Sequence, residues 1–135
     1  MIKGLLTGIS LLLSANLAFA GEVLDGNQIR DLLVGNTLQA DYRAAGECRH
    51  TFYEYFADDG KVYGRDKRAQ QASGYTRYLG TWEVKNGEFC VNVAYGHRGG
   101  CSVFERVDKD TFIRKFDGFE IDRVKVYPGR FVPCM

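Results

Sequence analysis

Hydrophobic and polar residues alternate through most of the chain after Gly35, and this period of two predicts β-strands. Alternating or aromatic-rich segments occur at eight places, each bounded by turn residues. Asn86-Gly87 and Asp117-Gly118 are dipeptides that favour two-residue hairpin turns. The predicted strands are residues 38–42, 49–56, 61–65, 78–84, 89–95, 102–107, 111–116 and 120–127.

No helical pattern separates these strands, so we expect them to pair consecutively as antiparallel hairpins. A meander of this kind leaves exposed edges unless the sheet curls and closes on itself. The predicted fold class is therefore all-β: a small up-and-down antiparallel barrel of about eight strands, or a strongly curled sheet. The polar stretch at residues 65–76 is predicted to be a mobile loop between two strands.

One short helix is predicted before the first strand. Asp25 is a suitable N-cap, and Gln28 lies three residues later, as in a capping box. Apolar residues between Gln28 and Gly35 fall on one helical face, and Gly35 is placed to end the helix in a left-handed conformation. A helix of about ten residues needs a surface to pack against, so we place it across one end of the barrel.

The first twenty residues differ from the rest. Lys3 precedes an apolar run from Leu5 to Leu17, and Ala18-Phe19-Ala20 closes the segment, as in a cleavable secretory signal. The run falls short of the ~20 apolar residues that cross a membrane, and Gly21 stands where a lipoprotein has a cysteine. We expect residues 21–135 to form a single exported barrel domain, periplasmic or secreted, without a membrane anchor.

Charge excludes some function classes. The chain has 18 basic and 17 acidic residues, and Lys3 is the only charged residue among the first twenty, so residues 21–135 carry no net charge. Without a positive field, neither nucleic acid nor an anionic membrane is an expected partner. One local basic stretch comprises Arg65, Lys67, Arg68 and Arg77. It is either a solvated loop or a patch for an acidic partner protein or an anionic envelope surface.

The four cysteines all follow the predicted cleavage point, and an even number in an exported chain predicts two disulfides. Three pairings are possible. Cys90 and Cys101 flank a predicted turn, so they can face each other across neighbouring strands at disulfide distance. A Cys48–Cys134 bridge then follows by elimination, and its long loop would contribute about 4–5 kcal/mol in the chain-entropy model.

Rings and charges recur on one face of several strands, because residues two apart share a face. If these faces point into the barrel, they form a pocket for a small amphipathic or anionic ligand. Two alternatives are a glutamate–arginine pair buried in an ordinary core and charges that simply face solvent. The candidate ligand-binding residues are Phe52, Glu54, Trp82, Phe104, Arg106 and Arg114.

Catalytic and metal chemistry have little support. After the predicted signal the serines are Ser73 and Ser102, neither in a G-x-S-x-G context, and only His50 and His97 could act as a base. Cys48 and His50 could share a strand face, but a disulfide removes the thiolate that a zinc site requires. We therefore expect no enzymatic activity, no metal and no cofactor.

Several motifs occur in a suggestive order: Gly35-Asn36-Thr37, Tyr53-Glu54-Tyr55-Phe56, Asp59-Gly60, Gly80-Thr81-Trp82-Glu83-Val84, Phe89-Cys90 and Cys101. Together they resemble a family of small secreted proteobacterial proteins of uncharacterised function with a lipocalin-like barrel. The similarity spans most of residues 24–107. It implies the barrel fold and a Gram-negative periplasmic setting, and it carries no catalytic residues to this chain.

The sequence thus favours a non-catalytic periplasmic binding module for a small amphipathic or anionic ligand. The alternative is a protein-interaction module, such as an inhibitor of an envelope hydrolase, acting through a loop at 65–76 or 96–100. A roomy interior lined by rings would favour the first, and a filled interior with protruding loops the second. The expected partner is a small molecule or an envelope protein, and the oligomeric state stays open.

Overall fold

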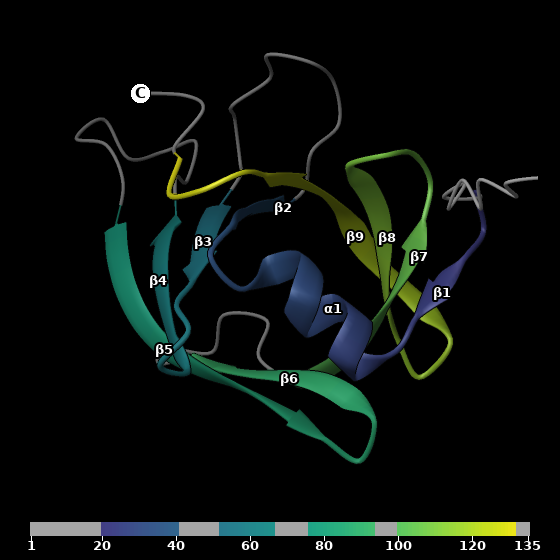
Figure 1. The fold of residues 1–135 in the computed structure, drawn as a ribbon, viewed down its shortest axis with the longest axis horizontal. Coiled ribbons are helices and arrows are strands. Elements are labelled where there is room, and N and C mark those ends of the chain that lie inside the picture. The colour runs from purple at the N-terminus through teal and green to yellow at the C-terminus, as the bar shows by residue number, and fades with distance from the viewer. Residues whose placement is uncertain (1–19, 41–51, 67–75, 94–99, 132–135) are drawn as a thin grey trace, which may run out of the picture.

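The computed structural model describes residues 20–40, 52–66, 76–93 and 100–131 (Figure 1). Within them the chain forms one helix and nine strands. These are β1 (Val23–Leu24), α1 (Gly26–Leu33), β2 (Thr37–Ala40), β3 (Phe52–Phe56), β4 (Lys61–Asp66), β5 (Thr76–Lys85), β6 (Glu88–Val93), β7 (Gly100–Arg106), β8 (Thr111–Phe116) and β9 (Phe119–Tyr127). The predicted signal peptide up to residue 19, Cys48, Cys134 and both histidines lie outside the described residues.

Strands β2 to β9 form a closed antiparallel barrel. Each strand pairs with the next one along the chain, and β9 returns to pair with β2 through Leu38 opposite Val126 and Ala40 opposite Val124. The predicted up-and-down barrel is therefore confirmed. Figure 1 looks along the barrel and shows α1 framed by the ring of strands.

The two hairpin dipeptides form the turns that the sequence predicts. Asn86 and Gly87 have φ values of 52° and 75°, and Asp117 and Gly118 have 50° and 78°. Two consecutive positive φ values define the type I′ turn, whose twist matches that of the flanking strands. The β5–β6 and β8–β9 connections are thus set by local sequence.

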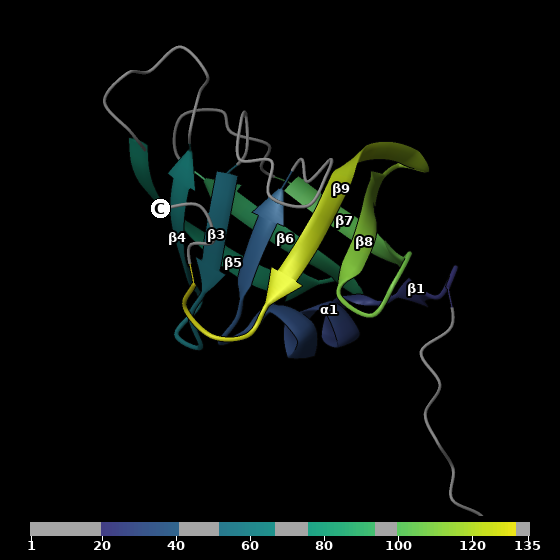
Figure 2. The same ribbon diagram turned by 90° about the horizontal axis from the view of Figure 1, so that it is seen from above.

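The helix begins with the predicted capping box. The Asp25 carboxylate accepts a hydrogen bond from the Gln28 backbone N–H, and the Gln28 side chain accepts one from the Asp25 backbone N–H, both at 2.9 Å. The helix is shorter than expected and ends at Leu33, with Val34 extended and Gly35 at a φ of 81°. Figure 2 shows α1 across one end of the barrel, which we call the helix-covered end. No helix in the described part of the chain is long and apolar enough to cross a membrane.

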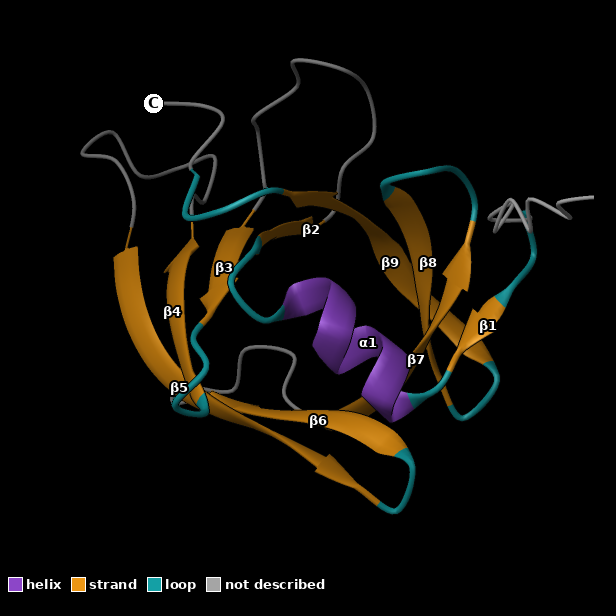
Figure 3. Ribbon diagram, viewed as in Figure 1, coloured by secondary structure: helices purple, strands orange, loops and turns teal. Residues whose placement is uncertain are grey.

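The first strand was missed by the sequence analysis, because two residues carry no alternation. β1 pairs with the second half of β7, with Val23 opposite Glu105 and Leu24 opposite Phe104. The first half of β7 pairs with β6 instead. The N-terminal segment therefore enters between β6 and β7 at the helix-covered end, as Figure 3 shows for β1 and α1.

The core fills the barrel at the helix-covered end. Ile29 and Leu33 of α1 are fully buried against apolar residues from the strands. Phe89 is central to this packing: its ring centroid lies 5.7 Å from those of both Phe56 and Trp82. Burying these rings removes a large apolar area from water, which is the main driving force for closing the barrel.

Strands extend into both ends of the polar stretch at 65–76. Arg65 and Asp66 belong to β4, and Thr76 belongs to β5, with Arg65 opposite Arg77 and Asp66 opposite Thr76 in the ladder. The prediction of a loop was therefore wrong at both ends, because backbone pairing extends strands into segments without hydrophobic alternation. Residues 67–75 lie outside the described residues.

The segment after β9 crosses the outside of β2. The Thr37 hydroxyl donates a hydrogen bond to the Gly129 carbonyl at 2.7 Å and accepts one from the Phe131 backbone N–H at 2.9 Å. The Asn36 side-chain carbonyl accepts a third, from the Gly129 N–H at 3.0 Å. We call residues 128–131 the C-terminal strap.

Candidate functional site

The six predicted ligand-binding residues all lie on the inner face of the barrel. Residues directly paired across a ladder point to the same side of the sheet. Glu54 pairs with Leu38, and Arg114 pairs with Phe104, which are both buried in the core. The same argument places the other predicted residues inside, since Trp82 pairs with the core-packed Val91.

Three of the six belong to the packed, helix-covered half. Trp82 stacks on Phe89, and its indole N–H donates a hydrogen bond to the Ala57 carbonyl at 2.6 Å. Phe104 is fully buried in the core. Arg106 donates from Nε to the Glu22 carboxylate at 3.2 Å and from Nη1 to the Lys109 carbonyl at 2.9 Å. These side chains hold the N-terminal segment and the core together.

The other three, Phe52, Glu54 and Arg114, lie in the half of the barrel away from α1. This half ends at the β8–β9 turn, and we call that end the mouth (Figure 2). Arg114 donates from Nε and Nη2 to the two carboxylate oxygens of Asp122, at 2.8 and 2.6 Å. The Arg114 guanidinium carbon also lies 5.7 Å from the centroid of the Phe52 ring.

Glu54 receives a hydrogen bond from a residue outside the set of six predicted ligand-binding residues. The Tyr78 hydroxyl donates to Glu54 Oε1 at 2.8 Å, and both side chains are buried. Tyr78 can cross the interior because Gly64 faces it from β4: a Cβ atom built on Gly64 would lie 2.0 Å from the ring. We call Glu54, Tyr78, Arg114 and Asp122 the interior polar cluster.

Both missed members of this cluster carry a weak sequence signal. Tyr78 shares the alternating face of Trp82, and Asp122 shares the face of Val124 in the last predicted strand. Their partners could not be read from the pattern, because Asp122 meets Arg114 only through the β8–β9 register, which shifts at a bulge after Arg114.

A pocket of about 250 Å³ opens beside the cluster at the mouth. Its lining residues are Val91, Gly100, Cys101, Ser102, Arg114, Phe116 and Ile121. We call it the mouth pocket. Phe116 and Ile121 are 56% and 38% exposed, so exposed apolar surface and the buried Arg114 line the same pocket. Exposed apolar surface next to a few oriented polar groups is typical of a ligand site.

The Arg114–Asp122 pair sets the electrostatics of the pocket. Its side chains are only 8% and 1% exposed. Removing two charges from water costs several kcal/mol per ion, so a buried pair is weak evidence for stability. The bidentate geometry holds the guanidinium in one orientation at the base of the pocket. Because Asp122 already balances the charge of Arg114, the pair brings no net charge to the pocket.

Catalytic and metal chemistry gain no residues from the described part of the chain. There, no three histidine, cysteine, aspartate or glutamate side chains gather closely enough to hold a metal ion. Ser102 lines the mouth pocket, but the described residues include no histidine that could activate it. What the pocket offers is a rigid arginine, a hydroxyl and an apolar wall, which together can hold a small molecule.

The disulfide predicted between Cys90 and Cys101 is present. The two cysteines are directly opposed in the β6–β7 ladder, with an S–S distance of 2.02 Å. The predicted Cys48–Cys134 bridge falls outside the described residues.

Comparisons of this chain with protein-family models, with curated proteins and with solved structures found no match. The resemblance to small secreted proteobacterial proteins stays a prediction. A barrel fold hosts many unrelated activities, so function has to be inferred from the chemistry of the site.

Proposed function

We propose that this protein is a non-catalytic binding module whose mouth pocket takes a small amphipathic ligand with a polar or singly anionic headgroup. The observation that carries the proposal is that an apolar surface and a buried charged side chain line the same pocket. Partly exposed Phe116 and Ile121 form an apolar wall, and the same pocket is lined by Arg114, which is buried in an ion pair with Asp122. An amphipathic molecule is the ligand that satisfies both.

The size of the pocket supports a small ligand. Its volume of about 250 Å³ lies just below the roughly 300–1,000 Å³ of sites for drug-sized molecules. The apolar part of the ligand would pack on Phe116, Ile121 and Val91. Its headgroup would accept hydrogen bonds from Arg114 and from the Ser102 hydroxyl, both of which line the pocket.

The packed half of the barrel limits how deep the ligand goes. Trp82, Phe104 and Arg106 are engaged with the core and the N-terminal segment. Of the predicted set, Arg114 is the residue that lines the mouth pocket, and the Phe52 ring lies beside its guanidinium. The predicted secretory signal supports a periplasmic or secreted setting, where envelope lipids and their fragments supply amphipathic molecules.

A fluorescent amphipathic anion, anilinonaphthalene sulfonate, tests the site by titration into the folded protein. Phe116→Ala should weaken binding about fivefold, because truncating a half-exposed ring removes roughly 1 kcal/mol of apolar contact with the ligand. Phe119→Ala is the matched control. Phe119 pairs with Phe116 across the same turn and is 76% exposed, but it does not line the pocket.

Equal loss of binding in the two variants would contradict the mouth pocket as the site. It would show that the probe associates with the hairpin tip as a whole. That result would favour the alternative, a protein-interaction module, for which the exposed Phe119 at the tip of a protruding hairpin is the supporting observation.

A further inference from the structure

Two rows of paired residues cross the outside of the neighbouring strands β3, β4 and β5 (Figure 1). The row nearer the mouth is Tyr53–Arg65–Arg77, and the next row is Tyr55–Tyr63–Leu79. Both rows point outward, because their chain neighbours Glu54 and Tyr78 meet inside the barrel. Together the rows contain two arginines, three tyrosines and a leucine, and none of these residues is acidic. The mouth pocket uses none of them.

The first row places two like charges side by side. Arg65 and Arg77 are directly opposed in the β4–β5 ladder, where Cβ atoms lie about 4.5–5.5 Å apart. Like charges in this arrangement destabilise a sheet. Arg77 is exposed to solvent, and a carboxylate bound to it would accept charge-assisted hydrogen bonds and reduce the repulsion. The position of Arg77 is therefore unfavourable for the barrel alone and favourable for binding an anionic group.

A third arginine reaches this face from the C-terminal strap. The Arg130 guanidinium carbon lies 5.1 Å from the ring centroid of Tyr55 and 4.7 Å from that of Tyr63. Stacking on rings uses the flat faces of a guanidinium, whereas its N–H donors lie in its plane. Arg130 is exposed, so a partner can approach these donors from solvent. The strap thus fixes a cation on the row next to the Arg65–Arg77 pair.

Leu79 adds an apolar contact to this cationic face. It lies within β5 and yet is 64% exposed, and it pairs with Tyr63, the tyrosine nearest to Arg130. Arginine and tyrosine are enriched at protein interfaces and among the residues that dominate their binding energy. We call the following residues the arginine–tyrosine patch: Tyr55, Tyr63, Arg65, Arg77, Leu79 and Arg130.

We propose that the arginine–tyrosine patch is a docking surface for an acidic partner protein, whose carboxylates bind Arg77 and Arg130 while an apolar side chain packs on Leu79. Charge complementarity identifies the partner, because the patch contains three arginines and no acidic residue. An anionic membrane fits less well, since electrostatic attachment to lipid needs a cluster of about four to eight basic residues. The mouth pocket is lined by residues of β6 to β9, so docking on β3 to β5 does not depend on the proposed ligand.

A fluorescein-labelled peptide of about ten glutamates tests the charge, by anisotropy during titration with the full chain. Arg77→Glu should lower the affinity at least about fivefold, because it replaces an attracting charge with a repelling one. The matched control is Arg123→Glu, which makes the same change in net charge on the outside of β9. Arg123 pairs with Ile113, and its side chain is 54% exposed. This control should change the affinity by less than about twofold.

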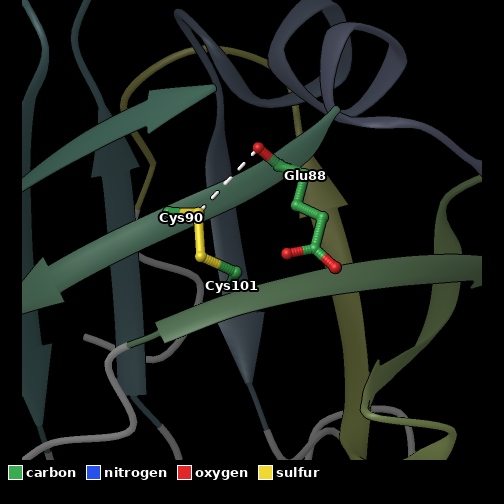
Figure 4. Close-up of a disulfide and its surroundings, with 3 residues drawn as sticks. All are labelled: Glu88, Cys90 and Cys101. Carbon is green, nitrogen blue, oxygen red and sulfur yellow. Dashed lines mark hydrogen bonds between the residues drawn. A yellow bond between two sulfur atoms is a disulfide. The ribbon is translucent and has the colours of Figure 1, made fainter. Parts of the chain in front are cut away.

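A second peptide tests the apolar contact. It has the same number of glutamates with leucines between them, and it should bind about fivefold more tightly through one half-buried leucine contact. Leu79→Ala should remove most of that gain. Arg77→Glu should leave the thermal midpoint unchanged or raise it, because a glutamate opposite Arg65 replaces a like-charge pair. All three substitutions leave intact the disulfide that joins β6 to β7 (Figure 4).

Four results would overturn the docking surface. Equal losses of affinity in Arg77→Glu and Arg123→Glu would show that the peptide senses only net charge. Equal affinity for the two peptides would show that the face takes any polyanion. A lower thermal midpoint of Arg77→Glu would show that this arginine serves the barrel itself. Absence of peptide binding, together with binding to phosphatidylglycerol vesicles that Arg77→Glu weakens, would assign the face to a lipid surface instead.

Discussion

Because the Tyr78 ring lies close over Gly64, we predict that Gly64→Ala destabilises the protein. A Cβ atom at this position would lie 2.0 and 2.1 Å from two ring carbons, far inside van der Waals contact. Gly64 lies in the middle of β4 and needs no positive φ, so alanine suits its backbone. The cost of the substitution therefore comes from the ring, which has to leave its place and withdraw its hydroxyl from Glu54.

The magnitude follows from three contributions. Overpacking an interior site costs about 1–3 kcal/mol, and a lost buried hydrogen bond costs about 0.5–3 kcal/mol. Against this, alanine is favoured over glycine in a strand by about 0.5–1 kcal/mol. We expect Gly64→Ala to lower the free energy of unfolding by about 2–4 kcal/mol, seen as a lower urea midpoint with an unchanged m value.

The control is the same substitution in a Tyr78→Ala background. Without the ring, the new methyl group has space, so Gly64→Ala should there be neutral or stabilising by about 0.5–1 kcal/mol. A double-mutant cycle should thus give a coupling energy of more than about 2 kcal/mol between the two positions. If Gly64→Ala lowers the free energy of unfolding equally in both backgrounds, the Tyr78 ring does not lie over Gly64. The hydrogen bond from Tyr78 to Glu54 in the interior polar cluster would then be wrong.

Two further predictions concern buried polar contacts. Thr37→Val keeps the shape of a side chain that is 2% exposed but removes both hydrogen bonds to the C-terminal strap. It should lower the free energy of unfolding by about 1–3 kcal/mol and speed limited proteolysis after Tyr127. Unchanged proteolysis would show that these two hydrogen bonds do not hold the strap in place. Arg114→Leu leaves the buried Asp122 carboxylate without its arginine and should lower the free energy of unfolding by about 3–5 kcal/mol, whereas adding Asp122→Leu should recover most of that loss. Thermal unfolding of the natural protein, the single variant and the double variant measures both effects. A double variant that is no more stable than the single one would contradict the pairing.

Local sequence determined the helix, the eight barrel strands and their order along the chain. A hydrophobic period of two is enough to mark a strand whose one face is buried, which holds for β8 and most of β9. Asn86-Gly87 and Asp117-Gly118 select a turn through backbone conformations that few other residues tolerate. Asp25 and Gln28 begin the helix through contacts only three residues apart. The Cys90–Cys101 bridge belongs to this class too, because a single hairpin brings its ends together.

Tertiary structure alone decided the closure and the site. Val23 and Leu24 become a strand only because β7 offers them an edge, and β2 meets β9 only after the whole sheet has curled. Alternation correctly placed six candidate residues inside, but it could not tell the mouth from the helix-covered end. That distinction depends on where α1 packs, which is a long-range event. The partners of Arg114 and Glu54 likewise depend on strand register and on the space over Gly64, and neither is encoded in the spacing of polar and apolar residues.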